Sequence, residues 1–126
     1  MARAREARAR AHSPYSGFRV GAAARDAGGR VFTGCNVKNA SFGLTLCAER
    51  VAVVKAVSEG AERLVSLAVA TDRDRVVMPC GACRQVLLEL APRLRLIVAG
   101  KGNRRRRTTV RELLPDAFGP ADLPRG

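Results

Sequence analysis

The sequence predicts a single α/β domain in which helices pack on a mixed β-sheet. Apolar runs typical of buried strands alternate with helical segments through the middle of the chain. The length of 126 residues is that of one ordinary domain, and an apolar content of 47% is enough for one buried core. No internal repeat or linker divides the chain, so we expect one domain over residues 1–126.

The N-terminal half predicts a short helix, a β-hairpin and a loop. Strong helix formers fill residues 2–11, and the segment 13–17 ends this helix because Pro14 disfavours helical backbone at the residue before it. Residues 18–24 and 30–35 are predicted strands, and Asp26-Ala27-Gly28-Gly29 between them has the composition of a hairpin turn. The polar, Gly-containing residues 36–46 predict a loop.

The C-terminal half alternates helices with buried strands. The clearest helix is predicted over residues 47–59, with Gly60 in the position of a C-terminal cap. We further expect buried strands at 64–70 and 94–99, a helix at 81–90, a basic turn at 100–107, a short strand and helix at 108–114, and an irregular tail at 115–126.

The net charge of +12 comes from 23 basic and 11 acidic residues, and only three of the basic residues are Lys. Such an arginine preference is also expected from the codon usage of a GC-rich genome. The arginines gather at Arg3, Arg5, Arg8 and Arg10 and at residues 104–107, which we interpret as a solvated helix end and a solvated turn. We therefore expect no nucleic-acid partner; any polyanion affinity would be sensitive to salt.

Membrane insertion and secretion are not predicted. No apolar run approaches the ~20 residues that a membrane span needs, and residues 1–12 lack the apolar centre of a secretory signal. We expect a cytoplasmic protein. Four cysteines in such a chain favour metal binding over a disulfide framework.

Three of these cysteines lie at the starts of the two central predicted helices, in Cys47-Ala48-Glu49 and in Pro79-Cys80-Gly81-Ala82-Cys83. The two-residue gap in the second group lets one helical turn direct both sulfurs to one point, and a helix N-terminus stabilises thiolates. Three thiolates predict a Zn²⁺ site whose fourth position is left for water. Cys35 is interpreted as a small buried apolar residue and His12 as a surface residue.

Glu49 is the predicted catalytic residue. It follows Cys47 by two residues, close enough to reach the zinc-bound water without binding the metal. Its carboxyl group can take the water proton and deliver it to a ring nitrogen. Arg50 and Arg84 are placed to offset the excess negative charge of three thiolates through hydrogen bonds to sulfur. A Cys-x-Glu group followed by Pro-Cys-x-x-Cys is the pattern of zinc deaminases.

The chain resembles the small homotetrameric cytidine deaminases, and the blasticidin-S deaminases are similar relatives. The resemblance implies a three-layer α/β/α sandwich with a mixed five-stranded sheet, a zinc ion held by Cys47, Cys80 and Cys83, and proton shuttling by Glu49. The matching motifs run nearly end to end: Ser13-Pro14-Tyr15-Ser16-Gly17-Phe18, Gly34-Cys35-Asn36-Val37, Asn39-Ala40-Ser41-Phe42-Gly43, Cys47-Ala48-Glu49-Arg50, Lys55-Ala56-Val57-Ser58-Glu59-Gly60, Pro79-Cys80-Gly81-Ala82-Cys83-Arg84-Gln85-Val86 and Glu112-Leu113-Leu114-Pro115-Asp116-Ala117-Phe118.

The same resemblance implies the substrate contacts. Phe18 would pack against the pyrimidine, Asn36 would hydrogen-bond the sugar, and Ala48 would belong to the same binding surface. Phe118 would help close the site of a neighbouring subunit, so we expect a homotetramer with shared active sites. The expected reaction is hydrolytic deamination of a cytosine nucleoside, with release of ammonia.

Lys38 departs from the family, whose loop reads Asn-Val-Glu-Asn with a Glu that accepts hydrogen bonds from the ribose. A carboxylate only accepts hydrogen bonds, and an ammonium group only donates them. Lys38 therefore favours, as the substrate, a cytosine nucleoside with an anionic group on its sugar over plain cytidine or deoxycytidine. Blasticidin-type deaminases, which act on modified cytosine nucleosides, also depart from Glu at this loop. The alternative is a solvated loop lysine.

Two other functions stay open on the sequence. Deamination of cytosine within RNA or DNA would require the base to be flipped into the pocket, and the basic composition favours it, but aromatic residues for stacking are scarce. A zinc-stabilised module without activity would normally have four protein ligands, and the retention of Glu49 disfavours it.

Overall fold

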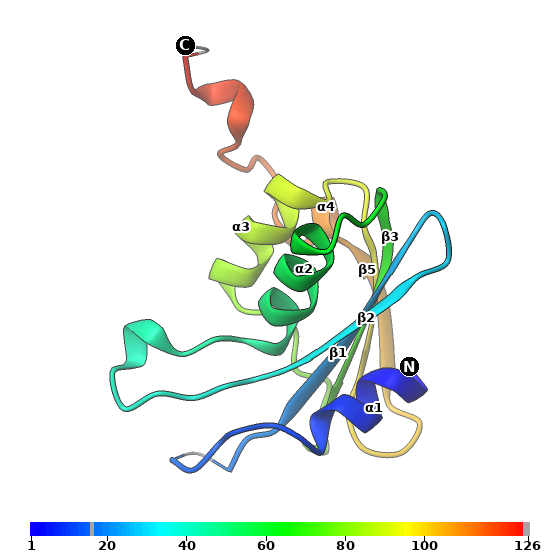
Figure 1. Ribbon diagram of the computed structural model, residues 1–126, viewed down its shortest axis with the longest axis vertical. Helices are drawn as coiled ribbons and strands as arrows, with labels where there is room; N and C mark the ends of the chain where they lie inside the picture. Colours follow the sequence, from blue (N-terminus) through cyan, green and yellow to red (C-terminus); the bar gives the residue numbers. More distant parts are fainter. Residues whose placement is uncertain (16, 125–126) are drawn as a thin grey trace.

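A mixed five-stranded sheet forms the middle of the computed structural model, which describes residues 1–15 and 17–124 (Figure 1). Strand β3 runs parallel to β4, and the other neighbouring strands are antiparallel. In the order β2-β1-β3-β4-β5 the strands are β2 (Val31–Cys35), β1 (Val20–Asp26), β3 (Leu64–Thr71), β4 (Arg95–Ala99) and β5 (Arg105–Thr109). Ser16 of the predicted helix-ending segment and the last two residues of the predicted tail, Arg125 and Gly126, lie outside the described residues.

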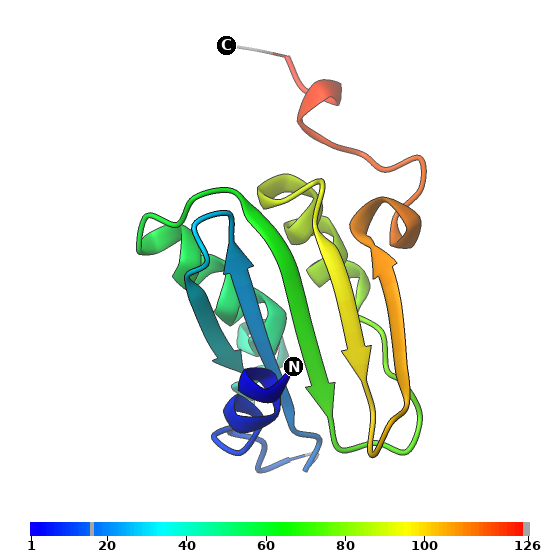
Figure 2. The same ribbon diagram turned by 90° about the vertical axis from the view of Figure 1, so that its right-hand side faces the viewer.

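Helices cover the two faces of the sheet unequally. The short helix α1 (Ala2–Arg8) lies on one face, and α2 (Ala48–Ser58), α3 (Gly81–Leu90) and α4 (Val110–Leu113) lie on the other (Figures 1 and 2). This arrangement confirms the expected three-layer sandwich. No helix in the described part of the chain is long and apolar enough to cross a membrane.

Small residues on β1 and β2 let the helices approach the sheet closely. A Cβ atom on Gly21 would collide with the backbone of α1 at Ala4, and one on Gly34 would collide with the backbone of α2 at Ala52. The two glycines face opposite sides because side chains alternate along paired strands. Each helix is therefore held close to the sheet, and the position of the N-terminus of α2 is fixed by this packing.

The main core lies between the sheet and helices α2 and α3, and it is aliphatic, as its composition predicts. Leu67, Leu87 and Leu94 are among its largest fully buried side chains. A smaller cluster between α1 and the sheet consists of alanines, Ala4, Ala23, Ala68 and Ala70. The main core thus supports α2 and α3, and the predicted metal ligands lie at the N-termini of these helices.

Both central helices form where the sequence predicts them. Helix α2 has Cys47 as its N-cap and ends before Gly60, which has a φ of 75° that glycine adopts without strain. Helix α3 covers the predicted residues 81–90, with Cys80 as its N-cap. The first helix ends at Arg8, three residues earlier than the predicted residue 11.

The prediction of a basic turn over residues 100–107 is wrong in its second half. Arg105, Arg106 and Arg107 belong to β5 and pair with Ala99, Val98 and Ile97 of β4. Backbone hydrogen bonding to β4 outweighs the poor strand propensity of charged residues, and edge strands commonly carry such charges. The turn itself is confined to the residues before β5, where Gly102 has a φ of 66°.

Three smaller differences concern the ends and loops. The predicted loop 36–46 contains a 3₁₀ turn at Phe42–Leu44, and the predicted irregular tail contains another at Pro120–Asp122. Cys35 is only partly buried, whereas the sequence indicated a buried residue. His12 is exposed, as expected.

Candidate metal centre and active site

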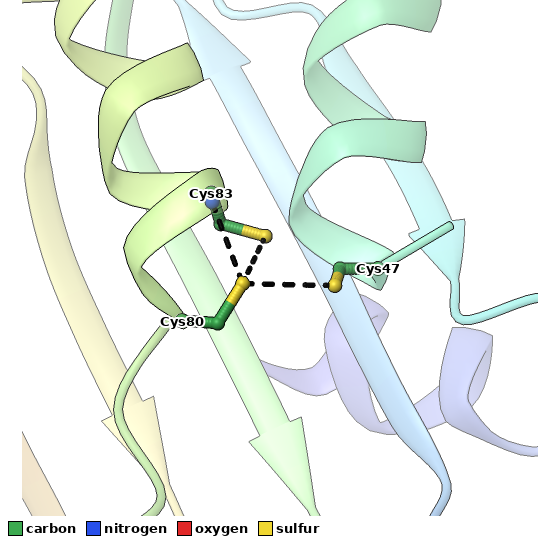
Figure 3. A group of neighbouring side chains, drawn as sticks. All are labelled: Cys47, Cys80 and Cys83. Carbon is green, nitrogen blue, oxygen red and sulfur yellow. Dashed lines mark hydrogen bonds between the residues drawn. The ribbon is translucent and has the colours of Figure 1, made fainter. Parts of the chain in front are cut away.

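The N-termini of α2 and α3 bring three cysteine sulfurs together (Figure 3). The Sγ atoms of Cys47 and Cys80 are 3.9 Å apart, and those of Cys80 and Cys83 are 3.4 Å apart. All three sulfurs lie within 4.8 Å of one another. The backbone N–H of Cys83 also donates to the sulfur of Cys80, as expected for an N-cap residue.

These separations fit a tetrahedral zinc ion. With Zn–S bonds of about 2.3 Å, sulfurs at the corners of a tetrahedron lie roughly 3.8 Å apart. The Cys80–Cys83 and Cys47–Cys80 sulfur distances, 3.4 and 3.9 Å, lie on either side of that value. Cys47, Cys80 and Cys83 would hold the ion, and no fourth His, Cys, Asp or Glu joins this cluster in the described residues. One coordination position thus remains for water, which is the arrangement of a catalytic site.

Proton sharing among the sulfurs shifts the pKa values of two thiols in opposite directions. Hydrogen bonding with Cys83, together with hydrogen bonds to Arg50 and Cys80, lowers the pKa of Cys47 to about 5. The same hydrogen bond, together with burial, raises the pKa of Cys83. A site that already stabilises a thiolate is prepared for a divalent cation, because metal binding requires deprotonated ligands.

Glu49 lies in the first turn of α2, beside the sulfur cluster. Its side chain is buried, with 6% of the residue exposed, and its Oε2 accepts a hydrogen bond from the Sγ of Cys83 at 3.5 Å. Burial raises the pKa of this carboxyl group, and the nearby charge of Cys47 adds to the effect. A carboxyl group that holds a proton more readily than usual suits a residue that must both take up and release one.

The two arginines predicted to contact sulfur behave differently. The Nη2 atom of Arg50 donates to the Sγ of Cys47 at 3.7 Å and to the carbonyl oxygen of Thr45 at 3.2 Å. Arg84 instead donates to two carbonyl oxygens, those of Pro79 at 2.8 Å and Leu113 at 2.9 Å. Within the described residues it makes no hydrogen bond to sulfur, so its contacts hold the loop before α3 against α4.

A cavity of about 210 Å³ opens beside the cluster and has a mainly apolar wall. Of the residues that the sequence assigned to the site, Cys47, Cys80, Glu49, Phe18, Asn36, Lys38 and Ala48 line it. The sequence did not indicate Val20, Thr71, Val77 and Met78, which also line it. These four are ordinary core or loop residues in the sequence, and only the strand register and the path of the loop before α3 bring them to the cavity.

Asn36 fixes the wall of the cavity. It is almost fully buried, at 3% exposed, and its Oδ1 accepts from the backbone N–H of Val20 at 2.9 Å. Its Nδ2 donates to the carbonyl oxygen of Phe18 at 2.7 Å. Since each group of the amide can make a second hydrogen bond, Asn36 positions Phe18 while keeping capacity for a ligand.

Phe118 lies apart from this cavity. It is 59% exposed, and its carbonyl oxygen accepts from the side chain of Gln85 at 2.8 Å. The tail that carries it extends beyond α4, away from the sheet (Figure 2). In a single chain, therefore, Phe118 does not join the other predicted site residues.

Comparison with known proteins gives a consistent result. The family model described as the cytidine and deoxycytidylate deaminase zinc-binding region matches residues 1–100. A cytidine deaminase of Mycobacterium tuberculosis (strain CDC 1551 / Oshkosh) is 52% identical over 97% of this chain and 89% of its own length. One from Halalkalibacterium halodurans is 49% identical over 94% of this chain and 90% of its own length.

Solved structures agree. The crystal structure of cytidine deaminase from Burkholderia pseudomallei has a TM-score of 0.89 and 44% identity, covering 93% of this chain and 94% of that one. The cytidine deaminase from Mycobacterium tuberculosis has a TM-score of 0.79 and 49% identity, covering 94% and 93%. The match extends through both cysteine groups and the glutamate between them, and the chain belongs to the zinc-binding cytidine deaminase family.

Proposed function

We propose that the chain catalyses the hydrolytic deamination of a cytosine nucleoside to the corresponding uracil nucleoside and ammonia. The observation that carries this proposal is the position of Glu49. Its buried carboxyl group lies 3.5 Å from a cysteine sulfur of the metal cluster and lines the same cavity as Phe18 and Asn36. The carboxyl group of Glu49, the cysteine cluster and the apolar residues that could contact a pyrimidine ring thus lie around one cavity.

The protein groups divide the work of the reaction. Cys47, Cys80 and Cys83 would hold a zinc ion, which would supply the Lewis acidity for activating water. Glu49 would take the first proton of the attacking water and deliver it to the ring nitrogen N3 as the water oxygen bonds to C4. It would then take the remaining hydroxyl proton and deliver it to the amino group at C4. The C–N bond breaks, ammonia leaves, and a carbonyl forms in its place. Phe18 packs against the pyrimidine, and Ala48, which lies beside Glu49 with no exposed surface, bounds the base site.

Lys38, in place of the ribose-binding Glu of the family loop, distinguishes the proposed sugar site of this chain. Lys38 lines the cavity, and its backbone N–H is fixed by a hydrogen bond to the carbonyl oxygen of His12 at 2.8 Å. A cation there supports recognition of a carboxylate or phosphate on the sugar portion of the substrate. We infer that such an anionic cytosine nucleoside is turned over better than plain cytidine.

A homotetramer with shared active sites is also part of this proposal. Phe118 is exposed and is not among the residues that line the cavity of its own chain, as expected for a residue that closes the site of another subunit. Large apolar side chains are also exposed in the loop before α2 and on α2 itself: Phe42, Leu44, Leu46, Val54 and Val57. Exposed apolar residues of this size support an interface between subunits.

The reaction would return cytosine nucleosides to the uracil pool, which is a pyrimidine salvage step. Cysteines that act as metal ligands must stay reduced, and this condition is met in the cytoplasm. We therefore place the enzyme there.

The test is a substrate panel with the zinc-loaded protein. Cytidine, deoxycytidine, cytidine 5′-monophosphate and a cytosine nucleoside with a sugar carboxylate are compared by the absorbance change on deamination. We expect turnover of at least one free nucleoside or nucleotide. Absence of turnover on all of them, with activity on a cytosine-containing oligonucleotide, would replace this proposal with deamination of a polymer.

Lys38→Glu is the variant that tests the sugar preference. It restores the residue of the family pattern, so we expect it to raise kcat/KM for cytidine and lower it for the anionic substrates. A wild-type preference for plain cytidine that Lys38→Glu does not improve would contradict the role given to Lys38.

A further inference from the structure

The face of the sheet opposite the active site is only partly covered. Helix α1 lies across the end of β1 that carries Gly21, and β4 and β5 have no helix over them on this side (Figure 2). The strand register places Arg25, Ser66 and Arg95 in one row across β1, β3 and β4 on this face. In the next row, Arg107 of β5 pairs with Ile97.

Three adjoining hollows run across this surface. The first, of about 520 Å³, shares Ser66 and Ile97 with a second hollow beneath α1, and it shares Arg95 with a third at the amino ends of β3 and β4. Together we call them the arginine trough, which is lined by six exposed arginines: Arg3, Arg25, Arg63, Arg93, Arg95 and Arg107.

The positive charge of the trough is not neutralised by the protein. Glu112 is the one carboxylate among the lining residues of these hollows, and its Oε2 is engaged by the hydroxyl of Thr108 at 2.9 Å. Among the described residues the ion pair within 4.0 Å is that of Lys101 with Asp74, outside the trough. The local field is also visible in the α-amino group of Met1, whose pKa is lowered by burial and then by Arg105, Arg25 and Arg5.

The chemistry of the lining indicates the kind of partner. Arginine offers a planar fork of donors that fits phosphate oxygens. Aromatic side chains, on which unpaired bases would stack, are absent from the lining of these hollows. Large exposed apolar residues, which a membrane surface or a protein partner would use, lie elsewhere: in the segment before β1, in the loop before α2, on the helices of the other face and in the tail.

We propose that the arginine trough binds the sugar–phosphate backbone of double-stranded nucleic acid, without base recognition, on the side of the sheet opposite the deaminase site. This binding differs from the expectation drawn from the sequence, which interpreted the two arginine clusters as solvated. Only Arg3 and Arg107 of the trough belong to those clusters. The register of the sheet joins arginines from β1, β4 and β5 with others at strand ends into one surface. The duplex is a partner here, and the substrate of the active site remains a free nucleoside.

A matched pair of triple variants tests the proposal. In the trough variant, Arg25, Arg95 and Arg107 are changed to Gln. In the control variant, Arg75, Arg106 and Arg111, which are exposed and outside the trough, are changed to Gln. Both variants lose three positive charges, so a difference in their duplex affinity must come from where those charges lie. Thermal unfolding and zinc content of each variant establish folding independently of deaminase activity.

Binding is measured by fluorescence anisotropy with a labelled duplex at several salt concentrations. For wild type we expect log K to fall linearly with log salt. For the trough variant, the slope of log K against log salt should be smaller in magnitude by about 2.7, because three phosphate contacts are lost at about 0.9 each. Its affinity at low salt should also fall roughly tenfold or more. The control variant should keep both values near wild type.

Several results would overturn the proposal. They are equal losses in both variants, no duplex binding by wild type at low salt, or tighter binding to a single strand than to the duplex. Loss of binding to anionic lipid vesicles or to an acidic polypeptide in the trough variant, with duplex binding unchanged, would assign the surface to that partner instead.

Discussion

The guanidinium group of Arg73 lies over the ring of Phe18, with Cζ 4.6 Å from the ring centroid. Arg73 comes from the segment between β3 and α3, and Phe18 precedes β1, so the contact joins two segments far apart in the sequence. On its backbone side, Phe18 is held by Asn36. The backbone of Phe18 is thus fixed by a hydrogen bond, and its ring, which lines the cavity, is fixed by a cation–π contact.

Loss of the Arg73 side chain should loosen this ring without removing a reacting group. We expect Arg73→Ala to raise KM about two- to fivefold, with little change in kcat, because an exposed cation–π contact contributes about 0.5–1 kcal/mol. Arg73→Lys should recover part of the loss, since it keeps the charge. Steady-state kinetics with cytidine checks this, and a fall in kcat at unchanged KM would contradict a positioning role.

Asn36→Ala should be more damaging than Arg73→Ala. It removes two hydrogen bonds at 2.9 and 2.7 Å, and loss of the acceptor for the buried backbone N–H of Val20 costs about 1–3 kcal/mol. We expect a lower melting temperature and a raised KM together. Calorimetry and kinetics on the same sample measure both, and an unchanged melting temperature would show that Asn36 does not support the cavity wall.

Zinc binding should depend on the three clustered cysteines and not on the fourth. Cys83→Ser should lose most of the bound zinc, because a buried thiolate ligand is replaced by a poorer one. Cys35→Ser is the matched control, since Cys35 lies outside the cluster, and it should retain the metal. Metal analysis of purified protein gives the stoichiometry. Full zinc occupancy in Cys83→Ser would contradict the assigned ligand set.

Glu49→Gln should separate metal binding from catalysis. The amide keeps the size of the side chain but cannot take up and release a proton, so kcat should fall by about two to four orders of magnitude while the zinc content stays at the wild-type level. Metal analysis and kcat are compared for the two proteins. If wild type and Glu49→Gln both contain zinc and neither has activity on any substrate, the chain is a zinc-stabilised binding module.

Asp26 should make folding stability depend on pH. It is buried, at 1% exposed, and its carboxylate accepts from the backbone N–H groups of Arg30 at 2.9 Å and Glu62 at 3.0 Å. Burial acts to raise its pKa, but these hydrogen bonds outweigh it and lower the pKa from its ordinary value of 3.8. The stabilisation is therefore present above that ordinary value and is lost as the pH falls toward the lowered one.

Asp26→Asn tests this dependence. We expect the variant to melt at a lower temperature than wild type near neutral pH, and we expect the difference to shrink as the pH drops below 3.8. Asp74→Asn is the control: its residue is exposed and its ion pair with Lys101 is long, at 3.9 Å, so its melting temperature should match wild type. A difference for Asp26→Asn that is constant with pH would contradict the titration.

Local spacing within the sequence was enough to predict the cluster of three cysteines and the glutamate beside it. Cys47, Cys80 and Cys83 lie at helix starts, and Glu49 follows a ligand by two residues, so helix geometry alone restricts where these groups can point. The two helices that carry them were predicted for the same reason, because caps and apolar patterns are properties of neighbouring residues.

Tertiary structure decided what depends on register between distant segments. Residues 105–107 are a basic stretch in the sequence, but hydrogen bonding to β4 makes them part of an edge strand. The same register brings Arg107 near Arg95 and Arg25, and the loop before α3 brings Arg73 to Phe18. Arg84 lies next to a ligand in sequence, yet its guanidinium reaches α4 because carbonyl oxygens there are within its span. Short-range spacing therefore determined the chemistry at the helix ends, while the cavity wall and the outer surface follow from strand pairing and packing, which no local pattern encodes.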